Sequence, residues 1–557
     1  MSTKTKGKSR PATVSARPAP VSKTIKKSPD YQLILMWVMV LFFSILRIRL
    51  LDIPLERDEG EYAYMGRLIL DGIAPYQHAY NMKLPGTYFM YALVMGIFGE
   101  TIQGIHIGLL ISNAATMAVL FFAFRKIFNS SIALFAASVY GLMSLSPAFM
   151  GFAAHATQFV TLFAAGGLLT LAHFMQKGKP IMAFLTGILF GLSFLMKQQA
   201  VFFLLFGGIM VLAHYFTVKP LRFLPMVKQG FIYTLGGILP YALTALALKM
   251  AGAFDKFWFW TVEYAGKYAA GLSFKDGKAT FNESFQPMWQ EFKIFWLLFL
   301  AGLVLLFLSR FTVRQKLTAL LFTIFAFLTV VPGFYFRQHY FIPFLPAVGL
   351  CGGIALHYLA TQASALFNSR FPAYLPFAVF VIALFVILPQ KKEYYLSPDA
   401  ELISKNIYGS NPFLESPVIA EYIKENSSPE DRIAVLGSEP QICFYADRYS
   451  ASGHIYTYGL MEDHAYNKTM QQEMISEIEK AKPKFLVICN IGTSWLRREN
   501  SPSLIFDWSQ TYAQKHYDMV GITDIVSNTE TNYKWGAELQ TYQPKSENLI
   551  YIFKRKP

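Results

Sequence analysis

Charged side chains are scarce in this chain. They make up 15% of its 557 residues, whereas 54% of the residues are hydrophobic and the mean hydropathy is +0.34. A soluble globular domain carries about 25% charged residues. The composition therefore excludes a protein that is soluble along its whole length, and we interpret the chain as an integral membrane protein with room for one soluble domain.

Acidic residues are the rarer of the two signs. The chain has 35 Asp and Glu against 50 Lys and Arg, which gives a formal net charge of +15. In a soluble protein such a surplus suggests nucleic acid binding. Here the lysines and arginines lie in short connections between hydrophobic runs, which is typical of cytoplasmic loops. We therefore expect a lipid bilayer, and no nucleic acid, as their partner.

Cysteine is nearly absent. Cys351 lies in a hydrophobic run, and Cys443 and Cys489 lie near the C-terminus. No Cys-x-x-Cys pair and no Cys/His ligand spacing occurs, which excludes a disulfide-rich scaffold and a cysteine-based zinc site. We expect Cys443 and Cys489 to be buried free thiols; a disulfide between them is the alternative.

Long hydrophobic runs, by contrast, are abundant, and they predict about eleven membrane spans of roughly 20 residues each. The runs cover residues 31–51, 104–124, 131–147, 152–175, 181–196, 199–217, 229–250, 294–309, 316–332, 341–360 and 373–389. Residues 1–30 are rich in Lys, Arg, Ser and Pro and predict a disordered cytoplasmic tail. The membrane domain is thus expected to cover residues 31–390.

The distribution of charge between the runs predicts their orientation. With the N-terminus in the cytoplasm, five inner connections carry basic residues and no acid: 125–126, 177–179, 219–228, 310–316 and 370. The connection 52–104 holds seven acids against three bases and is expected outside. The aromatic-rich connection 251–293 is a second outer loop, and residues 84–99 predict an interfacial or re-entrant helix. We expect a multi-pass protein of the cell inner membrane.

Residues 391–557 are mixed and polar, and they predict a soluble α/β domain with a partly parallel sheet. Hydrophobic strand patterns occupy residues 432–437, 484–490, 519–526 and 549–554. Helical patterns separate them at residues 439–446, 466–482 and 503–514. An odd number of spans places this domain on the extracytoplasmic side.

Three carboxylates follow the first span within four residues: Asp58, Glu59 and Glu61. Carboxylates beside a bilayer are costly unless they are paired or used. They could act as a general base, bind a divalent cation such as Mg²⁺ or Mn²⁺, or pair with a cationic substrate; a solvated acidic loop is the alternative. Further residues of the outer loops are candidates for lining a substrate pocket with Glu61: Tyr62, Tyr76, His155 and Tyr264.

Four basic side chains on the same face could hold a phosphate. Lys83 lies at the mouth of the interfacial helix, where it could meet a lipid phosphate, or it could reach from the bilayer to water. Arg337 offers a planar fork for phosphate beside His339, although an aromatic belt with an anchoring arginine is the alternative. Lys197 lies in a tight outer turn between two spans.

Three of these stretches carry a resemblance to a known family. Asp58-Glu59 after the first span, then Lys83-Leu84-Pro85-Gly86, then Arg337 with His339 near the last spans resemble the GT-C glycosyltransferases. The similar members are the dolichyl-phosphate-mannose protein mannosyltransferases and aminoarabinose transferases of the family 39 type. The resemblance implies that Asp58 is catalytic, that Glu59 completes the acidic pair, and that the Lys83 element lines the lipid-phosphate donor site.

The chain also departs from that family. Many members have a second acid in the next outer loop, where this chain has His155 and Gln158, and the β-trefoil insert of the protein mannosyltransferases is absent. We expect no certain cofactor, with a divalent cation left open.

The expected function is sugar transfer, with inversion, from a polyprenyl-phosphate donor to a protein, lipid or polysaccharide. Lys83 and Arg337, with Lys197, would hold the phosphate. A transporter or flippase for a lipid-linked sugar is the main alternative; a membrane-anchored binding protein is another.

Overall fold

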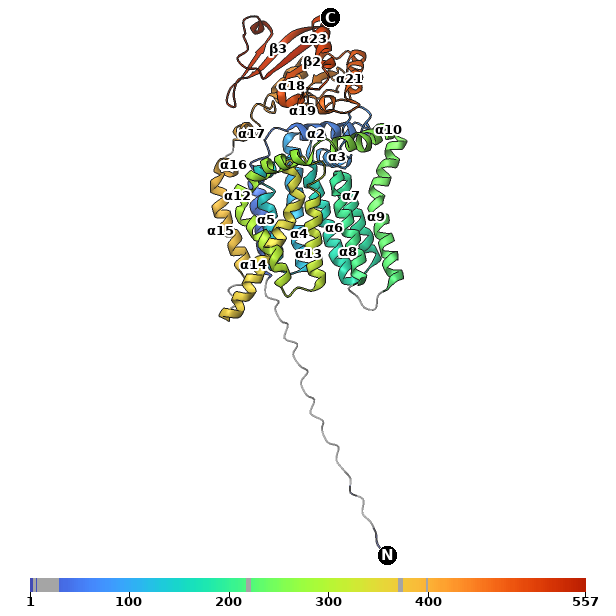
Figure 1. Cartoon of the computed structure of the whole chain (residues 1–557), viewed down its shortest axis with the longest axis vertical. Coiled ribbons are helices and arrows are strands. Elements are labelled where there is room, and N and C mark those ends of the chain that lie inside the picture. Colours follow the sequence, from blue (N-terminus) through green and yellow to red (C-terminus); the bar gives the residue numbers. More distant parts are fainter. Residues whose placement is uncertain (4–6, 8–29, 217–221, 369–373, 397–398) are drawn as a thin grey trace.

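A bundle of long helices carries a C-terminal domain on one of its ends (Figure 1). The computed structural model describes residues 1–3, 7, 30–216, 222–368, 374–396 and 399–557. Most of the predicted tail 1–30 lies outside these residues, as do Lys219 and Arg370 of the predicted inner connections.

Each of the eleven predicted spans is a helix of the bundle. Over the described ranges, seven helical stretches are long and hydrophobic enough to cross a membrane: Tyr31–Ile48, Ile102–Ile127, Ala156–Lys177, Gln198–Phe216, Phe223–Met250, Phe274–Leu308 and Gln338–Phe367. They contain helices α1, α4, α6, α8 (Val201–Phe216), α9, α12 and α14 (Leu345–Phe367). Shorter helices fill the remaining predicted positions: α5 (Ser130–Met143), α7 (Pro180–Met196), α13 (Val313–Leu328) and α15 (Leu375–Gln390). The chain is a multi-pass membrane protein.

Small residues allow the helices of the bundle to approach closely. A Cβ atom at Gly187 or Gly191 of α7 would lie 2.2 Å and 2.4 Å from backbone oxygens of α9. A Cβ at Gly302 of α12 would lie 1.9 Å from the carbonyl oxygen of Cys351 in α14. Without a hydrophobic driving force inside a bilayer, such close backbone packing is a main source of helix association.

Two helices of the first outer segment lie between the bundle and the C-terminal domain (Figure 1). The first, α2 (Arg57–Leu70), begins after Glu56, whose carboxylate accepts a hydrogen bond from the backbone N–H of Glu59. The second, α3 (Gly86–Phe98), follows Pro85 and confirms a helix within residues 84–99, where an interfacial or re-entrant one was predicted. The helix α2 was not predicted, because its buried face carries acids and tyrosines rather than a hydrophobic stripe.

The C-terminal domain contains a five-stranded mixed sheet of order β1-β2-β5-β3-β4. Its strands are β1 (Ile433–Leu436), β2 (Phe485–Asn490), β3 (Tyr517–Ile525), β4 (Thr531–Trp535) and β5 (Leu549–Arg555). Only β1 and β2 are parallel, so the predicted partly parallel sheet is confirmed. Helices stand at the three predicted positions: α19 (Pro440–Ala446), α21 (Asn467–Ala481) and α23 (Leu504–His516). Cys443 and Cys489 are buried free thiols, as expected.

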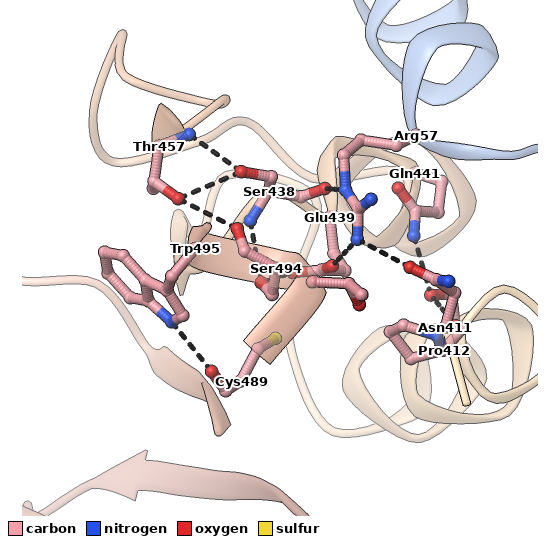
Figure 2. A network of polar contacts seen from close by, with 12 residues as sticks. Arg57, Asn411, Pro412, Ser438, Glu439, Gln441, Thr457, Cys489, Ser494 and Trp495 are labelled. Carbon is pink, nitrogen blue, oxygen red and sulfur yellow. Dashed lines mark hydrogen bonds and ion pairs between the residues drawn. The ribbon is translucent and has the colours of Figure 1, made fainter. Parts of the chain in front are cut away.

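A buried polar network fastens α2 to this domain (Figure 2). Arg57 donates from Nε to the carbonyl oxygen of Ser438 at 2.7 Å and pairs with Glu439 Oε1 at 2.8 Å. It also donates to Asn411 Oδ1 at 3.3 Å, and Ser494 donates its hydroxyl to Glu439. A buried charge is tolerated when it is paired and fully hydrogen-bonded. The first turn of α2 is therefore held by the soluble domain as well as by the bundle.

Candidate active site

A cavity of about 410 Å³ lies where the bundle, α2 and the C-terminal domain meet. Five parts of the chain line it: residues 56–58 with 80–83, residues 150 and 155 before α6, the second outer loop, the segment before α14, and the C-terminal domain. The predicted site residues that line this cavity are Asp58, Lys83, His155, Tyr264, Arg337 and His339.

Asp58 lies in the first turn of α2, where the helix dipole favours a carboxylate. Its Oδ1 atom accepts hydrogen bonds from Lys83 Nζ at 2.9 Å and from the hydroxyl of Tyr456 at 3.1 Å. Its Oδ2 atom lies 3.9 Å from His155 Nδ1, which is too far for a hydrogen bond. One oxygen of the carboxylate is thus fixed and the other is left without a partner among the described residues.

The charges around Asp58 are set by burial and by one lysine. Burial alone would raise the pKa of Asp58, but the Lys83 ammonium holds it well below its usual range. Burial raises the pKa of Glu61 to about 6, against the opposing charge of Lys83. Asp58 is therefore ionised across the physiological pH range, and Lys83 is shared between two carboxyl groups.

Lys83 is enclosed by the residues predicted to form the substrate pocket. Its ammonium lies 2.6 Å from Glu61 Oε2 and 4.7 Å from the centre of the Tyr62 ring. The hydroxyl of Tyr76 donates to the carbonyl oxygen of Lys83 at 2.6 Å. Glu61, Tyr62 and Tyr76 are buried and do not line the cavity. These three residues surround Lys83 outside the cavity lining. The charge of Lys83 is already balanced by Asp58 and Glu61.

Glu59 faces away from Asp58. Its Oε1 atom accepts a hydrogen bond from the backbone N–H of Ala154 at 2.6 Å and lies 3.2 Å from His106 Nε2. The side chain is 1% exposed and does not line the cavity. Consecutive residues of a helix point about 100° apart, so the two acids of the predicted pair serve different neighbours. Glu59 joins α2 to α4 and to the segment before α6.

Two histidines stack beside Asp58. The rings of His155 and His339 lie 3.9 Å apart with an interplanar angle of 14°. Both nitrogens of His155 and Nδ1 of His339 are buried without a hydrogen-bond partner. Burial lowers the pKa of His155 to about 4, so this imidazole is neutral and keeps a free lone pair. Ligand atoms of Asp58, His155 and His339 all lie within 4.8 Å of one another, and two imidazoles with a carboxylate suit Zn²⁺ or Mn²⁺ better than Mg²⁺.

Arg337 and Lys197 have no ion-pair partner among the described residues, and burial lowers the pKa of Lys197 well below its usual value. Arg337 is exposed to the cavity and follows a strained turn in which Gly333, Phe334 and Phe336 have φ of 81°, 57° and 43°. Positive φ at two phenylalanines is costly and is typical of functional segments. Lys197 lies over the Tyr340 ring at 3.5 Å and lines a small adjoining cavity rather than the main one.

The C-terminal domain supplies a wall of the cavity that the sequence did not predict. This wall consists of Tyr408, Asn411, Phe413, Tyr456, Tyr458, Gly459 and Glu462. Next to it, a π-helical turn (Phe259–Tyr264) of the second outer loop presents Trp260 and Tyr264 to the cavity, and Tyr264 donates its hydroxyl to Glu462 at 2.8 Å. Such turns are frequent at functional sites. Only the density of aromatic residues near Tyr456 and Tyr458 marked this wall in the sequence.

Comparisons with known proteins agree with this architecture. Residues 78–246, which include Lys83, His155 and Lys197, match the family model described as dolichyl-phosphate-mannose-protein mannosyltransferase. The structure of ArnT from Cupriavidus metallidurans bound to undecaprenyl phosphate is similar with a TM-score of 0.55 and 15% identity, over 94% of this chain and 98% of ArnT. The structure of the same ArnT in the apo state is similar with a TM-score of 0.54 and 14% identity, over 94% of this chain and 97% of ArnT. No curated protein sequence matches.

The fold and the family match confirm the resemblance that the sequence predicted. The chain is a polytopic helical protein with an ArnT-like fold. Through residues 78–246 it is similar to the dolichyl-phosphate-mannose-protein mannosyltransferases.

Proposed function

We propose that this protein transfers a sugar from a polyprenyl-phosphate-linked donor to an acceptor, on the membrane face that carries the C-terminal domain. The observation that carries the proposal is the unpartnered Oδ2 of Asp58 in a cavity that also holds the unpaired cation Arg337. The undecaprenyl phosphate bound to ArnT, a protein of similar fold, supports a lipid phosphate as the carrier.

This face is the extracytoplasmic one in our proposal. The helix α6 begins beside His155 in the site and ends 22 residues later at Lys177, about 33 Å away at 1.5 Å per residue. Likewise α4 ends at Arg125 and Lys126 after 26 residues. The positive-inside rule then assigns the end opposite the site to the cytoplasm.

In the proposed reaction Asp58 is the general base. The acceptor hydroxyl donates to Asp58 Oδ2, its oxygen forms a bond to the anomeric carbon, and the bond from that carbon to the phosphate oxygen breaks. The proton passes to Asp58, the electron pair leaves with the polyprenyl phosphate, and a single displacement inverts the configuration. A carboxylate of low pKa accepts such a proton late, once the attacking oxygen has become acidic.

We assign the leaving phosphate to Arg337 rather than to Lys83, and not to Lys197, which lines the adjoining cavity. A phosphate carries two negative charges as it departs, and fixed cations aimed at developing charge are a major source of catalysis. Lys83 is already bonded to Asp58 and Glu61, so its part is to orient Asp58. The guanidinium of Arg337 matches phosphate geometry, and His339 lies next to it at the cavity wall.

A divalent cation at Asp58, His155 and His339 is the second candidate use of this site. Bound there, it would supply positive charge beside the leaving phosphate. Because a cation on these ligands would occupy Asp58 Oδ2, base and metal ligand are mutually exclusive roles of that oxygen. The unpartnered nitrogens of both histidines are what favours this candidate.

Metal analysis of the purified protein distinguishes the two roles. If the site is a metal centre, protein exposed to Zn²⁺ or Mn²⁺ and then desalted retains one ion per chain, measured by mass spectrometry of the element, and the His155→Ala variant retains none. His173→Ala is the matched control, because that histidine binds the carbonyl oxygen of Leu169 within its own helix. If the parent protein, His155→Ala and His173→Ala retain equal amounts of metal, the metal centre is refuted and Asp58 keeps the role of base.

The proposed function itself is tested on cells that lack the protein. We expect their membranes to accumulate a polyprenyl-phosphate sugar, detected by lipid mass spectrometry, because its consumer is missing. Adding the purified protein to these membranes should consume the accumulated lipid. Accumulation without consumption by the purified protein, or uptake of the lipid across proteoliposomes without any transfer, would favour the flippase alternative.

A further inference from the structure

We propose that Tyr456 of the C-terminal domain is a positioning residue of the active site, which holds Asp58 so that Oδ2 faces the acceptor. The proposal rests on the base role of Asp58 given above. It assigns to the soluble domain a direct part in the reaction: the membrane bundle alone does not complete the site.

The contact that carries this proposal is direct. The Tyr456 hydroxyl donates to Asp58 Oδ1 at 3.1 Å, and its ring lies 5.1 Å from the Lys83 ammonium. With Lys83 as the only partner, the carboxylate could rotate to present either oxygen to the ammonium. A second donor on the same oxygen fixes the plane of the carboxylate and leaves Oδ2 free for the acceptor hydroxyl.

Tyr456 is itself fixed at both ends of its segment. On one side, the backbone N–H of Tyr80, in the first outer segment, donates to the carbonyl oxygen of Gly453 at 2.7 Å. On the other, the backbone N–H of Thr457 donates to the Ser438 hydroxyl at 2.9 Å. The carbonyl group of Ser438 accepts from Arg57, the residue before Asp58. The base and the residue that orients it are therefore anchored to one common network (Figure 2).

A matched residue is available in the same domain. Tyr449 does not line the cavity, and its hydroxyl donates to Asp71 Oδ2 at the end of α2, at 3.0 Å. Phenylalanine at either position keeps the ring and removes only a hydroxyl that donates to a carboxylate. The two variants therefore differ in whether Asp58 loses a partner.

The experiment compares full-length variants in steady-state assays. The donor lipid is that extracted from cells lacking the protein, the acceptor is supplied by membranes of the same cells, and donor consumption is followed by mass spectrometry. Tyr456→Phe is expected to lower kcat about 10- to 100-fold, the range for a hydrogen bond to a charged group, with the KM for the donor unchanged. Tyr449→Phe should stay within about twofold of the parent protein.

A double-mutant cycle separates positioning from a general structural effect. Asp58→Glu moves the carboxylate away from the Tyr456 hydroxyl, so adding Tyr456→Phe to Asp58→Glu should lower kcat much less than it does alone. Thermal unfolding midpoints of both phenylalanine variants should match the parent protein. Equal losses in Tyr456→Phe and Tyr449→Phe, or full multiplication of the two effects in the cycle, would overturn the proposal. Asp58→Asn separately tests the base role, so the two ideas fail by different results.

Discussion

Asp58→Asn is expected to abolish sugar transfer, lowering kcat by about 10³-fold or more, while the protein still inserts into the membrane and still binds the donor lipid. The substitution keeps the shape of the side chain and an oxygen that can accept from Lys83 and Tyr456. It removes the carboxylate oxygen that would take the acceptor proton, and general-base catalysis together with the lost electrostatic interaction accounts for a loss of this size.

The measurement is donor consumption at saturating acceptor membranes, with donor binding followed separately by native mass spectrometry. Asp52→Asn is the matched control, since this acid belongs to the same outer segment but is exposed and accepts a hydrogen bond from the side chain of Gln103 at 2.8 Å. Turnover by Asp58→Asn at the parent rate, with a normal Asp52→Asn, would refute the assignment of the base.

Arg337→Gln should lower kcat/KM by about 10²-fold, with weaker binding of the free polyprenyl phosphate. Arg337 is exposed to the cavity and has no ion pair with the described acids, so its charge is available to a ligand. Removing one preorganised group that stabilises developing charge costs about 10²- to 10³-fold in other enzymes. Binding of the lipid phosphate without a sugar isolates the contact with phosphate from the chemical step.

Lys267→Gln serves as the control for Arg337. Lys267 is an exposed base of the second outer loop and does not line the cavity. A loss of activity in Lys267→Gln equal to that in Arg337→Gln would mean that general electrostatic attraction of the lipid, rather than a specific phosphate contact, explains the effect. Unchanged lipid binding in Arg337→Gln would remove this residue from the donor site.

The membrane part of the fold was predictable because a stretch of about 20 hydrophobic residues has few other uses. Strand β4 was not predicted, because Thr531–Trp535 is a polar, half-buried edge strand with a single neighbour. The pairing of Asp58 with Lys83 was within reach, since both lie in one outer segment. The separate role of Glu59 could not be predicted. Asp58 and Glu59 point to different neighbours because α2 is a helix, and the sequence did not predict that helix.

The contribution of Tyr456 lay beyond sequence reasoning for a different reason. It comes from a soluble domain 398 positions further along the chain, and a tyrosine there is more simply explained as a core residue of an α/β fold. Arg57 presented the same difficulty, because its partners Ser438 and Glu439 lie on a loop after β1. Contacts between residues so far apart depend on how the two domains pack, which no local pattern records.

The order in which the cavity is built has a consequence for biosynthesis. Helices are inserted as the ribosome proceeds, so the residues that line the cavity between Glu56 and Tyr340 are synthesised before residues 408–462. If Tyr456 is required, a nascent or prematurely terminated chain could bind the carrier lipid but would not transfer the sugar to water or to a wrong acceptor. The protein would then become active only after its C-terminal domain has been translated and has folded.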